Sequence, residues 1–101
     1  SRLTCYINDY GMESAYSQFL KEFADSDSLV ILISSSGNSK NILNAAKHCI
    51  EKNIEMITLS GFSESNKLKT MTQDSYLHFW VDSSDYGVVE CLHQVILHTV
   101  V

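Results

Sequence analysis

The sequence predicts an α/β fold of three layers, in which a parallel sheet lies between two layers of helices. Short apolar runs alternate four times with helical patterns, and the connections between them are short. One of these runs, Leu29–Ile33, consists of five consecutive apolar residues. Such a run is typical of a strand that is covered on both faces, and alternating strands and helices are typical of right-handed βαβ units. The 101 residues fit a single domain, residues 1–101.

Hydrophobic periodicity predicts each element in turn. The pattern predicts strands at residues 3–7, 29–33, 54–59 and 76–81, and helices at residues 12–23, 42–50, 63–74 and 86–101. Ser39 and Ser65 are the expected N-caps of the second and third helices, and Asn53 is the expected stop of the second.

Composition excludes several classes of function. The net charge is -5, and Lys and Arg are scattered singly, so the sequence has no basic patch for nucleic acid or for anionic lipid. No apolar run approaches the roughly 18 residues of a membrane span. Three cysteines, Cys5, Cys49 and Cys91, stand at unrelated spacings within apolar stretches. This pattern predicts reduced thiols in a cytoplasmic protein.

A serine-rich turn, Ser34–Ser39, follows the apolar strand and precedes a helix. The hydroxyls of Ser34, Ser36 and Ser39, together with the first N–H groups of the helix, suit a phosphate group, and Gly37 permits a sharp turn. Serines also populate ordinary turns and helix caps. Five small polar residues around one glycine are more than a cap needs, so the turn favours a phosphate site.

The carboxyl ends of the other predicted strands are also polar, namely Asn8-Asp9, Ser60-Gly61 and Asp82–Asp85. Ligands of parallel α/β sheets bind at this edge. Asp9 is therefore better placed as a site residue than the loop aspartates, although it could equally cap the following helix.

The last predicted helix carries Glu90, Gln94 and His98 at four-residue intervals, which places them on one side over roughly 12 Å. A carboxylate and an imidazole on a common face are what a proton-transfer reaction uses. Glu90 and His93 also have a spacing that can serve a metal ion. The alternative is that Glu90, His93 and Gln94 form the solvated face of an amphipathic helix. His48 and His78 have no comparable partners and are interpreted as structural or surface residues.

These motifs resemble the sugar isomerase (SIS) domain family, and within it the phosphoheptose isomerases. The resemblance spans essentially the whole sequence. It rests on Asn8-Asp9-Tyr10-Gly11, on Ile33-Ser34-Ser35-Ser36-Gly37-Asn38-Ser39, on Ile57-Thr58-Leu59-Ser60-Gly61 and on the segment Glu90 to His98.

The resemblance implies a role for each site residue. The implied substrate and phosphate contacts are Ser34, Ser35, Ser36 and Ser39, with Asn8 and Asp9 near the sugar. His98 would stand at the position of the catalytic histidine. Glu90 would also be catalytic, at a position where the family usually carries glutamine. In some members this side chain and the histidine help to hold Zn²⁺, which makes Glu90 and His98 the implied metal ligands.

The implied activity is the isomerisation of sedoheptulose 7-phosphate to D-glycero-D-manno-heptose 7-phosphate, in heptose and lipopolysaccharide biosynthesis, by a homotetramer. The family's N-terminal helices, first strand, glycine-rich turn and catalytic glutamate have no counterpart here, and Val88 stands where an arginine is usual. The sequence is therefore expected to be the C-terminal part of a longer family domain. The alternative function is a non-catalytic module that binds a phosphosugar or another protein, since SIS domains also occur in that role.

Overall fold

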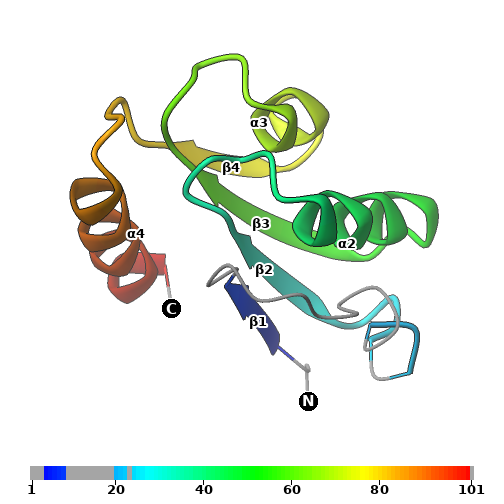
Figure 1. The fold of residues 1–101 in the computed structure, drawn as a ribbon. Coiled ribbons are helices and arrows are strands. Elements are labelled where there is room, and N and C mark those ends of the chain that lie inside the picture. Colours follow the sequence, from blue (N-terminus) through cyan, green and yellow to red (C-terminus); the bar gives the residue numbers. More distant parts are fainter. Residues whose placement is uncertain (1–3, 9–19, 23, 101) are drawn as a thin grey trace.

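A computed structural model describes residues 4–8, 20–22 and 24–100 of the chain, and these residues form a parallel sheet with helices on both faces (Figure 1). The elements are β1 (Thr4–Asn8), β2 (Leu29–Ile33), α2 (Lys40–Glu51), β3 (Glu55–Ser60), α3 (Lys67–Thr72), β4 (Leu77–Trp80) and α4 (Tyr86–Val100). The four strands lie in the order β1-β2-β3-β4, and all neighbours are parallel. The predicted α/β fold is confirmed. The helix predicted at residues 12–23 falls mostly outside the described residues, of which 20–22 are helical.

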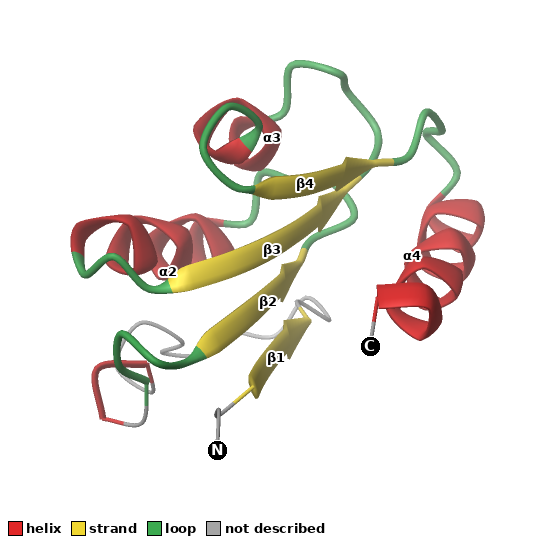
Figure 2. Ribbon diagram, turned by 180° about the vertical axis from the view of Figure 1, so that it is seen from behind, coloured by secondary structure: helices red, strands yellow, loops and turns green. Residues whose placement is uncertain are grey.

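The helices divide between the two faces of the sheet. α2 and α3 cover one face and α4 lies against the other, as Figures 1 and 2 show from opposite sides. Side chains of β2 alternate accordingly: Val30 and Leu32 belong to the core under α2 and α3, whereas Ile31 and Ile33 pack with Ile96 and its neighbours from α4. The sheet thus separates two apolar cores, which is why β2 is apolar at every position.

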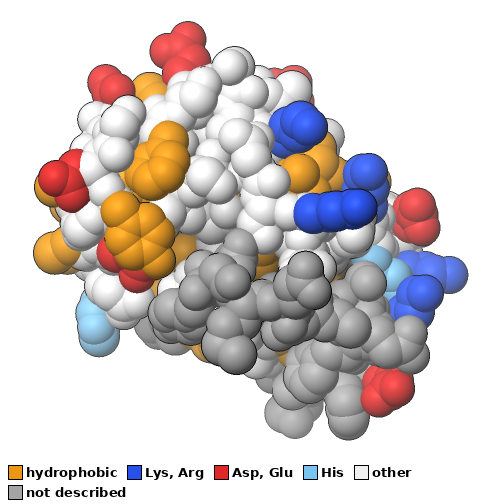
Figure 3. Space-filling model, viewed as in Figure 1, with side chains coloured by type: hydrophobic (Ala, Val, Ile, Leu, Met, Phe, Trp, Pro, Cys, Tyr) orange, Lys and Arg blue, Asp and Glu red, His pale blue; other side chains and the backbone are white. Residues whose placement is uncertain are grey.

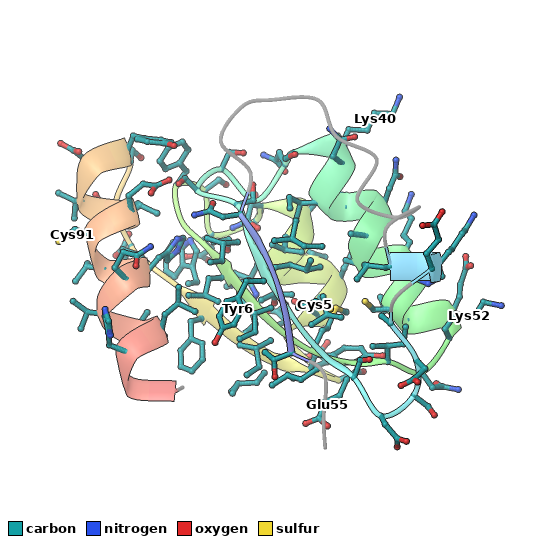
Figure 4. All side chains as sticks on the ribbon, turned by 90° about the horizontal axis from the view of Figure 1, so that it is seen from below. Cys5, Tyr6, Lys40, Lys52, Glu55 and Cys91 are labelled. Carbon is teal, nitrogen blue, oxygen red and sulfur yellow. The ribbon has the colours of Figure 1, made fainter. Side chains whose placement is uncertain are left out.

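On β1 the same alternation separates Cys5 from Tyr6. Figure 4 shows Cys5 on the side of α2 and Tyr6 on the side of α4. Cys5 is buried with Cys49 in the first core, and burial raises the pKa of both thiols, that of Cys49 to about 12. All three cysteines are unpaired, and Cys91 is exposed. None of the described helices is both long and apolar enough to cross a membrane.

The predicted stop of α2 is confirmed, and its geometry is that of a Schellman motif. Asn53 has a positive φ of 54°, and its N–H donates to the carbonyl of Ile50 at 3.4 Å. The N–H of Ile54 donates to the carbonyl of Cys49 at 2.9 Å. These two bonds satisfy carbonyls that the end of a helix leaves free.

The predicted N-cap of the third helix, Ser65, is wrong by one residue. Asn66 caps α3, because its side-chain Oδ1 accepts the N–H of Lys69 at 2.9 Å. Ser65 instead donates its backbone N–H to the hydroxyl of Ser63, at 3.2 Å, within the preceding turn. Both residue types are favoured caps, so the choice depends on tertiary contacts of Asn66 described below.

A buried polar network links β3, β4 and α3. The ring Nδ1 of His78 lies within hydrogen-bond distance of the hydroxyls of Thr58 and Thr72, and its Nε2 lies 2.9 Å from the hydroxyl of Ser60. Thr72 also donates to the carbonyl of Leu68 at 2.7 Å. Burial, together with the charge of Lys69, lowers the pKa of His78 to about 4. The interpretation of His78 as a structural residue is therefore confirmed, with the ring neutral at pH 7.

This network makes stability depend on pH in a defined window. The folded protein resists protonation of His78 until about pH 4, whereas the unfolded chain takes up that proton near pH 6.5. The stabilisation that comes from a neutral His78 is therefore fully present above pH 6.5 and is lost as the pH falls toward 4. Between pH 7 and 4.5 we expect the parent to lose about 1 to 2 kcal/mol more than a His78→Gln variant.

Urea unfolding at both pH values measures this difference. A His98→Gln variant controls for the loss of a histidine at an exposed position. Equal pH dependence of the parent and His78→Gln would contradict a neutral, hydrogen-bonded His78.

Candidate functional site

The serine-rich turn lies at the carboxyl end of β2 and is shaped by its own hydrogen bonds. Ser34 is buried, and its N–H donates to the carbonyl of Leu59 at 3.0 Å. The N–H of Gly37 lies 3.1 Å from both the carbonyl and the hydroxyl oxygen of Ser34. The hydroxyl of Ser36 accepts the N–H of Asn38 at 3.1 Å. The turn is thus held in one conformation by hydrogen bonds between its own residues.

Gly37 packs closely against the side chain of Asn66. Gly37 has a φ of +69°, a conformation that costs little only for glycine. A Cβ atom at this position would lie 2.0 Å from Oδ1 of Asn66. Asn66 is 1% exposed, and its Nδ2 donates to the hydroxyl of Ser60 at 2.9 Å and to the carbonyls of Gly61 and Ser63 at 3.2 and 2.9 Å. Sequence reasoning missed Asn66, although asparagine is a favoured N-cap.

Two further bonds join the turn to the start of α3. The side-chain Oδ1 of Asn38 accepts the N–H of Lys67 at 3.0 Å, and the carbonyl of Gly37 accepts the N–H of Leu68 at 2.9 Å. On the other side of β3, the N–H of Phe62 donates to the carbonyl of Ser83 at 2.8 Å. The loops that follow β2, β3 and β4 therefore form one connected edge.

The N-terminus of α2 opens onto this turn without a side-chain cap. Ser39 occupies the predicted N-cap position, and its carbonyl accepts the N–H of Leu43 at 2.9 Å, but its hydroxyl makes no capping bond. The first turn of α2 contains no acidic residue. The first N–H groups of the helix and the positive end of its dipole are therefore not neutralised by a side chain of α2, and they suit an anion.

The helix α4 reaches the serine-rich turn through Glu90. Glu90 is partly buried, and its Oε1 accepts a long hydrogen bond of 3.5 Å from the hydroxyl of Ser35. The approach of α4 is close because of Gly61, where a Cβ atom would lie 2.7 Å from both γ-carbons of Val89. At its start α4 is capped by Asp85, whose carboxylate accepts the N–H of Val88 at 3.2 Å. The structure thus brings together two residues that the sequence proposed for one site, Ser35 and Glu90.

The alternative prediction, that Glu90, His93 and Gln94 form a solvated face of α4, is wrong for His93. Gln94 is exposed, but His93 is 1% exposed and faces the sheet. Its Nε2 lies 2.9 Å from the carbonyl of Ser60 and must donate, since a carbonyl only accepts. Its Nδ1 is buried with no partner among the described residues. Burial lowers the pKa of His93, while the Ser60 carbonyl and the charge of Glu90 oppose this shift.

Three further predicted site residues are His98, Asn8 and Asp9. His98 lies in the last turn of α4 and is exposed. Asn8 ends β1, with its Oδ1 buried and unpartnered among the described residues, and Asp9 lies outside them. Within the described part of the chain, no group of three or more His, Cys, Asp or Glu residues could hold a metal ion. The role of Glu90 and His98 as metal ligands therefore stays a prediction.

The packing of Gly37 against Asn66 predicts the effect of adding one methyl group. Gly37→Ala would strain the backbone and push Asn66 from its hydrogen bonds, so we expect a loss of about 2 to 4 kcal/mol in the free energy of unfolding. Chemical denaturation measures it. Gly87→Ala is the matched control, because a Cβ there meets only Asp85 Oδ1 at 3.4 Å and alanine favours a helix. Equal stability of the two variants would contradict the assigned contact.

The chain is similar in sequence to known proteins. No protein-family model matches the chain. It is 34% identical over 100 residues to the phosphoheptose isomerase of Campylobacter concisus, covering 99% of this chain and 51% of that protein. It is 29% identical over 101 residues to that of Fusobacterium nucleatum, covering 100% and 50%.

The fold agrees with the sequence comparison. The structure of a phosphoheptose isomerase from Neisseria gonorrhoeae matches 90% of this chain and 50% of its own length, with a TM-score of 0.79 and 25% sequence identity. The chain spans about half the length of the proteins it matches. In sequence and in fold, the chain is a relative of the phosphoheptose isomerases.

Proposed function

We propose that this chain holds the phosphate of a sugar phosphate and belongs to a phosphosugar isomerase. The observation that carries the proposal is the uncapped N-terminus of α2 beside the serine-rich turn, in a chain similar to phosphoheptose isomerases. The specific reaction we propose converts sedoheptulose 7-phosphate to D-glycero-D-manno-heptose 7-phosphate, for heptose and surface polysaccharide biosynthesis. The unpaired cysteines support a cytoplasmic location for the protein.

The phosphate would be held mainly by neutral donors. The chain has a net charge of -5, so attraction by the whole protein does not favour an anion. The hydroxyls of Ser34, Ser36 and Ser39, the hydroxyl of Ser35 once it has left Glu90, and the first N–H groups of α2 would supply short, directed hydrogen bonds instead. Lys40, the first residue of α2, is exposed and adds one cation near that end.

The chemistry we propose is proton transfer through an enediol. A base removes the proton from the carbon next to the carbonyl, and an acid returns a proton to the neighbouring carbon. We assign one of these roles to His98, because histidine is the side chain that most readily exchanges a proton near neutral pH. Glu90, bonded to Ser35, would orient the sugar by accepting hydrogen bonds from its hydroxyls.

Replacement of single side chains tests this division of roles. In the purified protein, Ser39→Ala should weaken the binding of sedoheptulose 7-phosphate about tenfold, since one directed hydrogen bond to a charged group is lost. His98→Ala should leave binding within about twofold but lower kcat at least about a hundredfold. Calorimetry measures binding, and a coupled isomerisation assay measures turnover.

Gln73→Ala, at an exposed position after α3, is the control for both variants. Turnover by His98→Ala at the parent rate would overturn the catalytic role. Binding and thermal stabilisation by the sugar phosphate without turnover in the parent would favour the alternative, a non-catalytic phosphosugar-binding module.

A homotetramer is a further part of the proposal, supported by the outer face of α4. Val88 and Leu92 are 44% and 42% exposed, and Figure 4 shows Cys91, on the same helix, pointing away from the sheet. Apolar side chains at this spacing form a stripe along a helix. Burial of such a stripe against another subunit would remove apolar area from water.

Charge on this stripe tests the assembly. We expect the parent to be tetrameric at micromolar concentration, and Val88→Glu combined with Leu92→Glu to reduce the molar mass in light scattering. Gln94→Glu adds a charge at an exposed position on the same helix and is the control. A parent that is monomeric under these conditions would refute the assembly.

A further inference from the structure

A groove lies between α2 and α3, and the four serines proposed above to bind phosphate do not line it. Its volume is about 600 Å³, and it is lined by Asn38, Lys40, Leu43, Asn44, Lys47, Ser65, Lys67, Thr70 and Met71. None of Ser34, Ser35, Ser36 or Ser39 lines it. Asn38 lies at the border, since its Oδ1 is bonded to the backbone N–H of Lys67 at the start of α3.

The charge of this α2–α3 groove is opposite to that of the whole protein. Three of the six lysines in the sequence line it, and the described residues of its lining include no Asp or Glu, although the net charge of the chain is -5. Lys40, Lys47 and Lys67 are all exposed. Figure 3 shows lysine side chains gathered on the side of the molecule that carries α2 and α3, with apolar atoms between them.

Two other pockets show that this charge is not a general property of the surface. One of about 370 Å³ lies at the amino ends of β3 and β4, includes Glu55 and is lined by no lysine. Another, of about 480 Å³, places Lys21 and Lys52 together with Asp25. In that pocket the carboxylate of Asp25 offsets part of the positive charge, whereas no carboxylate does so among the described residues that line the α2–α3 groove.

The remaining lining indicates the class of ligand. Leu43 and Met71 contribute apolar surface, and the side chains of Asn38 and Asn44 offer amide groups that both donate and accept. Lysine ammonium groups bind phosphate as point charges. A volume of this size fits a small organic molecule rather than a bare phosphate ion, since ligand sites span roughly 300 to 1,000 Å³.

We propose that the α2–α3 groove binds a phosphorylated ligand with a flat aromatic ring that has a polar edge, of the class of nucleoside phosphates. The lysines meet the phosphates, Leu43 and Met71 contact the ring, and the asparagine amides meet its polar edge. This site borders the proposed sugar phosphate site, with which it shares Asn38 and Lys40, but its other lining residues lie outside the serine-rich turn.

ADP is the probe for this groove, with inorganic pyrophosphate as the probe for charge alone. In isothermal titration of the purified protein we expect ADP to bind more tightly than pyrophosphate. Lys47→Gln combined with Lys67→Gln should weaken ADP binding about tenfold or more, because two of the three cations that line the described part of the groove are lost. Both substitutions leave Lys40 and the serine-rich turn unchanged.

Lys21→Gln combined with Lys52→Gln is the matched control, since it removes the same charge from the pocket that also contains Asp25. That variant should bind ADP within about twofold of the parent. Equal weakening in both double variants, equal affinity for pyrophosphate and ADP, or no binding of ADP at millimolar concentration would overturn the proposal. Displacement of ADP by sedoheptulose 7-phosphate would also overturn it, because ADP would then occupy the serine-rich turn.

Discussion

The carboxyl edge of the sheet depends on one buried side chain, that of Asn66. Its amide donates to Ser60 and to two carbonyls of the following loop, and its Oδ1 caps α3. The same side chain packs against Gly37, so it also defines the space that the serine-rich turn occupies. A buried amide is costly unless its donors and acceptor are paired. Because Asn66 is fully paired here, it holds β3, α3 and the turn in one arrangement before any ligand arrives.

Much of the fold could be predicted from periodicity, and the exceptions have physical reasons. Leu29–Ile33 is strand β2 as predicted, because a strand that is covered on both faces of the sheet is apolar at successive positions. The predicted cap of α3 is one residue early, since Ser65 and Asn66 are both good caps, and the hydrogen bonds of Asn66 to β3 and the following loop, with its packing against Gly37, select between them. The burial of His93 was not predicted. Its hydrogen-bond partner is a backbone carbonyl, which every residue has, so no residue type in the sequence indicates the contact.

The candidate site was predictable in part. The serine-rich turn is evident from residue types alone, and the proximity of Glu90 to Ser35 agrees with placing both in one site. The network of Thr58, Ser60 and His78 had a sequence signal that was not used, namely two hydroxyl residues at alternate positions of a buried strand. Such residues need partners on neighbouring elements. The role of His98 cannot follow from position alone, because an exposed side chain at the end of a helix acquires its role from what binds beside it.

The close approach of α4 to the sheet at Gly61 has a consequence for how the family can diverge. A Cβ atom at position 61 would lie 2.7 Å from both γ-carbons of Val89, so the present distance between α4 and the end of β3 requires a glycine there. Glu90 follows Val89 directly, and its reach to Ser35 depends on the same distance. Positions 61 and 89 should therefore vary together among homologues, a small residue at one accompanying a larger residue at the other. Such covariation would indicate selection on the distance between α4 and the sheet, rather than on either side chain alone.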